Sequence, residues 1–394
     1  MKHLILPALA LAALATSFTA QAQNNATRRL VVALNSGDTA RYVVSDIASL
    51  SFEKDEPETP ATAQSYAITI PTDFADGRVM KVMAGGKQVA EVAYEWVRDY
   101  TTSANSQLHT VVYPMGTDGY ADITRGLSAT TGQTIAWNRV TNVPTITGDA
   151  GSASATVYLN ADGSLSLTSD SDSPASTTTE VYYLVDKRGS ETISYQIVKI
   201  GARYWTAENL RATKFIDGTD IPYYSSTQGE AWNANTTGAR HLRYDDEDNL
   251  LVYGYHYSGY CFDDEANMIP EGWALPTPNE FDSCYIAAGQ QTARFRSTSN
   301  DWGTSVGTNT SGFNAYPTGN FNGTTGDYDS STTILTQFWT NHIYFDVLDR
   351  TKTDPYRDYF QVTSTGRTKN LSDGSLVNKG HSRSWGHSVR FVRK

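Results

Sequence analysis

Short apolar runs alternate with polar turn residues over most of this chain, a pattern typical of β-strands. Residues 28–52 hold the runs LVVAL and RYVV around the turn residues NSGD, followed by SLSF, and are predicted to form a short β unit. Residues 65–187 repeat apolar runs between Gly- and Asp-containing turns, which predicts a β-sandwich-like domain. Its candidate strands are YAITI, RVMKVM, VAEVAYEWV, HTVVYPM, ATVYLN, SLSLTS and VYYLV. The run VAEVAYEW also fits one or two helical turns, because periodicity does not separate strand from helix in so short a stretch.

A helix start stands out in the third part of the chain, in LPTPNEFDSCYIAAG. Thr277 suits the N-cap, Pro278 suits the first helical position, and Glu280 completes a capping box. Gly289 suits a left-handed end. One face of this helix is apolar and would pack on a sheet: Phe281, Cys284, Tyr285 and Ala288. Asn279 and Glu280 are therefore interpreted as capping residues, the alternative being a polar sugar or metal site.

One polar segment separates two predicted domains, and another lies within the predicted sandwich. Residues 53–64, EKDEPETPATAQ, are acidic and contain proline, so they are predicted to be an extended, solvated linker. Residues 169–179 are polar enough for a loop. The third domain, residues 193–394, carries most of the aromatic landmarks and is predicted to be α+β, so the chain as a whole is expected to be mainly β.

The first 22 residues have the composition of a secretory signal. A charged start precedes an apolar run over residues 4–15, and AQA then provides a cleavage site. A buried helix is the alternative interpretation of this run. No cysteine follows, which argues against a lipid anchor, and no later stretch reaches 18 apolar residues, so no transmembrane segment is expected. The mature chain is expected to be exported to the periplasm, cell surface or medium.

Composition and charge exclude some partners. The chain has 30 Gly, 24 Tyr and only 19% charged residues, as in β-rich extracellular proteins. Its formal net charge is −11, whereas nucleic acids and anionic membranes both require a basic surface. Neither is expected as the main partner.

The two cysteines, Cys261 and Cys284, form an even pair in a chain expected to be exported. Such pairs are usually bonded in an oxidising compartment, so a disulfide is predicted. Closing this loop would stabilise the fold by about 3 kcal/mol. The alternative is two separately buried thiols.

The third domain contains a series of landmarks in a fixed order: IVKIGARYWTAENL, LVYGYHY, IPEGWALPTPNEF, SGFNAYPTGNFNG, FWT and HSVRFVRK. This series resembles the Fibrobacter succinogenes major paralogous domain, a family common in secreted and surface proteins of Bacteroidota and Fibrobacterota. The resemblance covers about half of the chain. It implies a C-type-lectin-like fold related to the formylglycine-generating enzymes. Separately, residues 28–52 resemble a short leader unit of secreted Bacteroidota proteins, through Ile47, Leu50 and Phe52.

Departures from the family pattern argue against catalysis. Many members have a cysteine and a histidine where this chain has Ile269 and Ala274. No cysteine follows Cys284, so the paired cysteines of the formylglycine-generating enzymes are missing. HExxH, P-loop and GxGxxG patterns do not occur either. His381 and His387 lack a neighbouring cysteine or carboxylate in sequence and are predicted to lie on the surface or in a loop.

Two acidic turns, residues 245–249 and 263–265, crowd carboxylates together without the ligand alternation or glycine of an EF-hand. Solvated turns are the favoured interpretation, and calcium is the one ion kept as an alternative. Neither EPN nor QPD occurs, and WNAN is only a partial match to the Trp-Asn-Asp strand of calcium-dependent lectins. No cofactor is expected.

Aromatic residues remain as candidates for binding. Trp205, Trp273 and Trp339 lie on the family landmarks and are expected in the core. Trp302 lies instead in the polar stretch STSNDWGTSVGTNTSG, near Tyr316 and Phe321. Rigid aromatic residues among Asn, Ser and Gly are typical of adaptable binding surfaces, so these three residues are predicted to contact a ligand.

The sequence therefore favours an exported, non-enzymatic binding or adhesion-type protein whose lectin-like domain presents loops to a glycan or a protein. Two alternatives stay open. One is a secreted carbohydrate-active hydrolase that uses loop carboxylates. The other is a structural component of a surface appendage or matrix.

Overall fold

The structure is a computed structural model that describes residues 29–33, 39–43, 64–72, 79–99, 106–328, 334–344, 355–364 and 380–394. The chain divides into two compact units, residues 1–64 and 65–394. In the first unit, β1 (Arg29–Ala33) pairs antiparallel with β2 (Thr39–Val43), which confirms the first two strands predicted there. The third predicted strand, the secretory signal and the linker lie outside the described residues.

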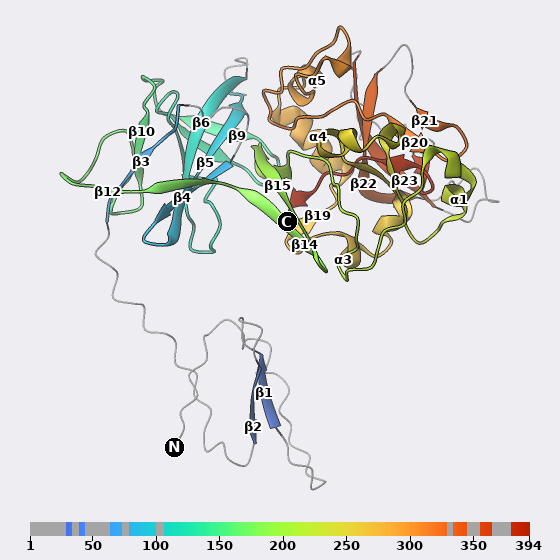
Figure 1. The fold of residues 1–394 in the computed structure, drawn as a ribbon. Helices are drawn as coiled ribbons and strands as arrows, with labels where there is room; N and C mark the ends of the chain where they lie inside the picture. Colours follow the sequence, from blue (N-terminus) through green and yellow to red (C-terminus); the bar gives the residue numbers. More distant parts are fainter. Residues whose placement is uncertain are drawn as a thin grey trace. The chain divides into compact units, whose positions relative to one another are not determined.

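The first part of the second unit is a β-sandwich, as predicted (Figure 1). A four-stranded and a seven-stranded sheet enclose one apolar cluster, to which Ile68 and Val157 contribute from one sheet and Val82 and Val112 from the other. The strands of the smaller sheet are, in spatial order, β11 (Leu165–Ser166), β10 (Thr156–Leu159), β3 (Tyr66–Thr69) and β12 (Ala175–Ser176). Those of the larger sheet are β13 (Thr178–Val181), β4 (Val79–Ala84), β5 (Lys87–Val97), β6 (Gln107–Pro114), β7 (Gly126–Ser128), β8 (Thr134–Trp137) and β9 (Pro144–Thr147).

The ambiguous run VAEVAYEW lies in β5 and is a strand. It pairs with both β4 and β6, and these two ladders settle what periodicity left open. The run VYYLV is divided between two sheets instead of forming one strand of the sandwich. Val181 ends β13, whereas Tyr183 begins a strand of the next sheet. The change of sheet therefore comes about ten residues before the predicted start of the third domain at residue 193.

The C-terminal part contains three sheets. The first joins β14 (Tyr183–Arg188), β15 (Glu191–Ile200), β16 (Arg203–Thr206), β26 (Val392–Arg393) and β19 (Trp273–Ala274). The second joins β17 (Arg240–Leu242), β18 (Tyr255–Ser258), β25 (Gly386–His387), β20 (Asn320–Asn322) and β21 (Gly326–Tyr328). The third joins β22 (Leu335–Tyr344), β23 (Tyr356–Thr363) and β24 (His381–Ser382).

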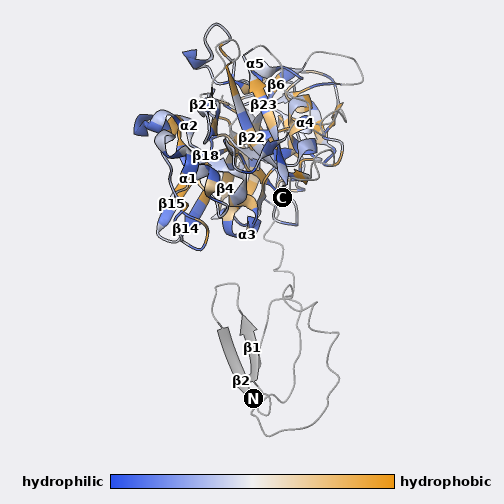
Figure 2. Ribbon diagram, turned by 90° about the vertical axis from the view of Figure 1, so that its right-hand side faces the viewer, coloured by the Kyte–Doolittle hydropathy of each residue, from blue (hydrophilic) through white to orange (hydrophobic). Residues whose placement is uncertain are grey.

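Short helices connect these strands. They are α1 (Gly229–Ala234), α2 (Leu250–Tyr253), α3 (Glu265–Met268), α4 (Pro278–Ala287) and α5 (Thr292–Phe295). Helix α4 begins as predicted, because Thr277 and Glu280 form the capping box and Gly289 has a φ of 73°. No helix among the described residues is long and apolar enough to cross a membrane. Figure 2 shows the hydrophobic residues gathered among the strands and on α4.

The sandwich and the C-terminal part share one hydrophobic core. Tyr113 and Trp137 of the sandwich pack in the same cluster as Val198, Trp205 and Phe281. A buried ion pair crosses the same junction, with Lys199 Nζ 2.5 Å from Glu95 Oε2 and both side chains fully buried. Trp205 and Trp339 are fully buried and Trp273 nearly so, as expected for core residues. The two predicted domains are therefore packed into one compact unit.

Candidate functional site

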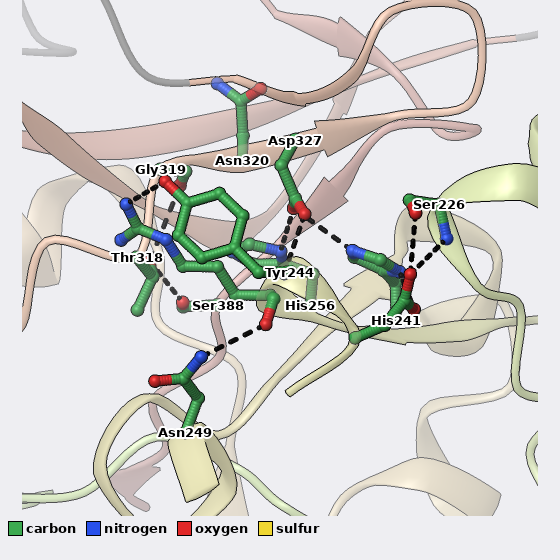
Figure 3. Close-up of polar contacts among 12 residues, drawn as sticks. Ser226, His241, Tyr244, Asn249, His256, Thr318, Gly319, Asn320, Asp327 and Ser388 are labelled. Carbon is green, nitrogen blue, oxygen red and sulfur yellow. Dashed lines mark hydrogen bonds and ion pairs between the residues drawn. The ribbon is translucent and has the colours of Figure 1, made fainter. Parts of the chain in front are cut away.

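The second C-terminal sheet curls so that side chains join its two edge strands, β17 and β21. Asp327 of β21 accepts a hydrogen bond from His241 Nε2 at 3.1 Å, and its second oxygen accepts one from the backbone N–H of Tyr244 at 2.8 Å (Figure 3). These contacts link segments more than 80 residues apart. Asp327 therefore closes the sheet.

A stack of rings supports this closure from inside. His241 and His256 are register partners on β17 and β18, with ring centroids 6.2 Å apart and planes 18° from parallel. Phe321 packs on His241 at 3.8 Å. Gly386 leaves room for this stack, because a Cβ there would lie 3.1 Å from that of His256 and 3.2 Å from that of Phe321. His241, His256 and Phe321 are all buried, so the stack is structural.

The two histidines differ in their hydrogen bonds. His241 Nδ1 lies 2.9 Å from the carbonyl oxygen of Tyr224, so both of its ring nitrogens face oxygen atoms. His256 is different, because burial lowers its pKa to about 3 and keeps it neutral near pH 7. Burial acts to raise the pKa of Asp327, but the hydrogen bond from His241, the neighbouring histidines and the hydrogen bond from the Tyr244 backbone together outweigh it, and the pKa is lowered. Asp327 is therefore a carboxylate.

Tyr244 and Asp245 have left-handed backbone conformations, with φ values of 57° and 54°. Such conformations are uncommon outside glycine and cost of order 1–3 kcal/mol each unless the surroundings hold them. Here Asp327 binds the Tyr244 N–H, while Asp245 accepts hydrogen bonds from Ser226 and from the Tyr223 hydroxyl. The strained turn is thus held at both residues.

The strained turn presents an aromatic ring. The Tyr244 side chain is 57% exposed, and the buried Arg243 guanidinium lies 4.7 Å from its ring centroid and 5.4 Å from that of Tyr253. Tyr253 in turn packs edge-on against Tyr316 at 5.8 Å, and its hydroxyl donates to Asp301 at 2.6 Å. We call Tyr244, Tyr253 and Tyr316 the tyrosine row.

The tyrosine row consists of held rings with hydroxyl groups at their edges. The polar side chains around it, Asp327 and Asp301, hydrogen-bond to the Tyr244 backbone and to the Tyr253 hydroxyl. The recorded partners of His241 and His256 are a carbonyl, a carboxylate and neighbouring rings, not a serine or cysteine nucleophile. Among the described residues, no three His, Cys, Asp or Glu side chains are placed to hold a metal ion.

Two of the three predicted ligand contacts are wrong. Trp302 is fully buried, because its indole N–H finds acceptors inside the fold, the Ala315 carbonyl at 3.1 Å and Ser297 Oγ at 3.2 Å. Phe321 is fully buried against His241. Only Tyr316 retains partial exposure, and its role in binding stays a prediction.

The predicted disulfide is also wrong. Cys261 and Cys284 are both free and buried, and they belong to different apolar clusters. Cys284 lies on the buried face of α4, whereas Cys261 donates to the Ala239 carbonyl near Ser258. Burial raises the pKa of Cys261 to about 12, so this thiol stays protonated.

His387 is not at the surface, contrary to prediction. It is fully buried, its Nε2 lies 2.9 Å from Nδ1 of the half-buried His381, and its ring stands edge-on to Trp339 at 4.1 Å. Burial first, and then the neighbouring His381 and His256, lowers its pKa. It contributes to the core beside the curled sheet.

The acidic turns have local structural roles. Asp246 accepts from the Asp248 N–H and caps a short helix, and Asp264 caps α3. Asp263 pairs with Arg383 at 2.5 Å. Tyr244 was not among the residues predicted from the sequence, because the carboxylates dominate its segment, YDDEDN. The tyrosine immediately before the acidic run was the available signal.

Comparison with known proteins identifies one relationship. Residues 198–393 match the family model described as the Fibrobacter succinogenes major domain, which contains β17 to β25 and the whole tyrosine row. No curated protein and no solved structure matches the chain.

Proposed function

Because residues 198–393 belong to the Fibrobacter succinogenes major domain family, we propose that the chain is an exported, non-enzymatic binding protein that presents the tyrosine row to a glycan. Adhesion outside the cell and the C-type-lectin-like fold implied by the sequence resemblance are part of this proposal. The secretory pattern of residues 1–22 supports export.

One observation carries the proposal, namely an exposed aromatic ring on a strained backbone. Tyr244 is 57% exposed although Asp327, which is 10% exposed and bonded to the buried His241, holds its turn. Strain retained at an exposed residue is typical of functional sites. Tyrosine suits a sugar, because its ring face packs on the C–H groups of a pyranose while its hydroxyl exchanges hydrogen bonds.

Rigidity adds to the argument. Arg243 lies against both Tyr244 and Tyr253, and Tyr253 is tied to Asp301, so the rings need little ordering when a ligand binds. Preorganised rings lose less conformational entropy on binding and so gain affinity.

The experiment is a glycan array probed with the full mature chain, the Tyr244→Ala/Tyr253→Ala double variant, and a Tyr158→Ala control. Tyr158 is a half-buried tyrosine in β10 of the sandwich. Wild type and control are expected to bind the same glycans, and the double variant is expected to lose at least tenfold in affinity, about 1.4 kcal/mol.

Other outcomes would overturn the proposal. Release of reducing ends from a bound polysaccharide would indicate a hydrolase, and binding confined to protein ligands would exclude the glycan. An unchanged glycan affinity in the folded double variant would show that the tyrosine row is not the binding surface. Export is tested separately, by the N-terminal sequence of the mature protein in fractionated cells, and an intact leader would contradict it.

A further inference from the structure

A concave surface lies between the loops of the sandwich and the first C-terminal sheet. It is a groove of about 330 Å³ with a smaller recess beside it, and the two share Tyr120, Arg393 and Lys394. The sandwich contributes Tyr120 and Arg139, and the C-terminal part contributes Tyr183 and Trp273. Ligand sites occur preferentially at such junctions between domains.

Strand register builds the floor of this groove. Trp273 of β19 is the register partner of Arg393 on β26, and Tyr204 of β16 flanks Arg393 on the other side. The Arg393 guanidinium lies 4.8 Å from the ring centroid of Tyr120 and 5.5 Å from that of Tyr182. Arg393 is thus fixed among aromatic rings contributed by several strands and by a sandwich loop.

The groove gathers positive charge on an acidic protein. The chain has a formal net charge of −11, yet Arg139, Arg203, Arg393 and Lys394 line the groove and its recess, with Glu271 as the one acidic lining residue. In the part of the chain that the structure describes, no ion pair is recorded for any of the three arginines. Unpaired arginines in a concave site attract and orient anions, carboxylates above all, through their planar fork of donors.

Exposed rings provide the second half of the chemistry. Tyr120 is 49% exposed and Tyr183 is 42% exposed, and both line the larger groove. Their faces offer apolar area and their hydroxyls offer hydrogen bonds within a small volume. A pocket near 300 Å³ is at the small end of ligand sites, which suits one or two sugar rings better than a folded partner.

We propose that this groove binds a carboxylated saccharide, with the uronate carboxylate on the arginines and a sugar face on Tyr120 or Tyr183. This site is distinct from the tyrosine row in its residues and in the charge of its ligand, and it goes beyond the proposed function. Arg393 and Lys394 both line the two parts of the groove, and Arg393 is the central cation because its guanidinium also lies among the rings.

The test is calorimetric titration of the full mature chain with trigalacturonate at 50 mM salt, and with a neutral galactose trimer of the same length. Tyr120→Ala and Arg139→Gln are suitable variants because both side chains are exposed. Lys87→Gln, at the exposed first residue of β5, removes the same charge elsewhere. Thermal unfolding midpoints establish that every variant is folded.

Trigalacturonate is expected to bind, and to bind at least fivefold more weakly to Tyr120→Ala and to Arg139→Gln but less than twofold more weakly to Lys87→Gln. Raising the salt to 300 mM should weaken binding, and the neutral trimer should bind at least tenfold more weakly. Absence of trigalacturonate binding, or full affinity in both groove variants, would overturn the proposal. Equal binding of triglutamate would overturn the assignment to a saccharide.

Discussion

Replacing Asp327 by asparagine tests how the surface turn is held. The side chain keeps its size and one carbonyl oxygen but loses its charge, and it is only 10% exposed. In the native chain it accepts from His241 Nε2 at 3.1 Å and from the Tyr244 N–H at 2.8 Å. A hydrogen bond to a charged group contributes about 1.5–3 kcal/mol, against about 0.5–1.5 kcal/mol for a neutral one.

The amide of Asp327→Asn has one acceptor oxygen for two donors, so one accepted bond is weakened by about 1 kcal/mol and the other is lost at about 1–3 kcal/mol, which predicts a free energy of unfolding lower by about 2–4 kcal/mol. Asp327→Ala leaves two donors without their acceptor and should cost more, about 3–5 kcal/mol. The strained conformation of Tyr244 then loses its support, so its turn is expected to open more readily.

Urea unfolding followed by circular dichroism measures the first effect, and hydrogen exchange at the Tyr244 amide measures the second. The exchange protection of Tyr244 should fall more than that of Val92 in the sandwich core. A stability loss below about 0.5 kcal/mol together with unchanged exchange at Tyr244 would refute the reasoning, because the carboxylate would then hold neither strand nor turn.

Three further predictions follow from burial. Trp302→Ala should lower the free energy of unfolding in urea by about 3–5 kcal/mol, because the side chain is fully buried. Trp302→Phe should leave glycan affinity unchanged, and an affinity loss in the folded Phe variant would show that Trp302 belongs to the binding site. Lys199→Met should lower the free energy of unfolding by about 3–5 kcal/mol, because it leaves the buried Glu95 carboxylate without its partner. Adding Glu95→Gln should recover part of that loss in thermal and urea unfolding, and no recovery would contradict the pairing. Burial lowers the pKa of His256 to about 3 in the folded protein, against 6.5 when unfolded, so its contribution to the free energy of unfolding is full above about pH 6.5. Below that pH the free energy of unfolding should fall, by about 2 kcal/mol at pH 5. Urea titrations at pH 7.5 and 5.0 should show this difference, and it should shrink in His256→Asn.

Local signals in the sequence predicted local structure well. The start and end of α4 followed from Thr277, Pro278, Glu280 and Gly289, because capping involves residues within one turn of each other. Six of the predicted sandwich runs fall on β3, β4, β5, β6, β10 and β11, whereas β7, β8 and β9 were not among the candidate strands. The boundary near Tyr183 was not predicted, because a change of sheet between two adjacent strands leaves no mark in periodicity.

The candidate site depends on contacts that no local pattern contains. Tyr244 and Asp327 are 83 residues apart and meet only because the sheet curls. Trp302 lies in a polar stretch yet is buried, since its indole N–H finds the Ala315 carbonyl inside the fold. An even number of cysteines in a chain expected to be exported predicted a disulfide, but the two cysteines are free and belong to separate apolar clusters. Pairing across the fold decided each of these outcomes.

The central claim is that the tyrosine row forms the surface on which a glycan binds. An aromatic NMR titration of the full mature chain, labelled on tyrosine, with the strongest ligand from the array tests it most directly. The account predicts shifts at the ring signals of Tyr244, Tyr253 and Tyr316, with Tyr158 unchanged. Saturable glycan binding with unchanged chemical shifts at all three tyrosine rings would contradict the claim.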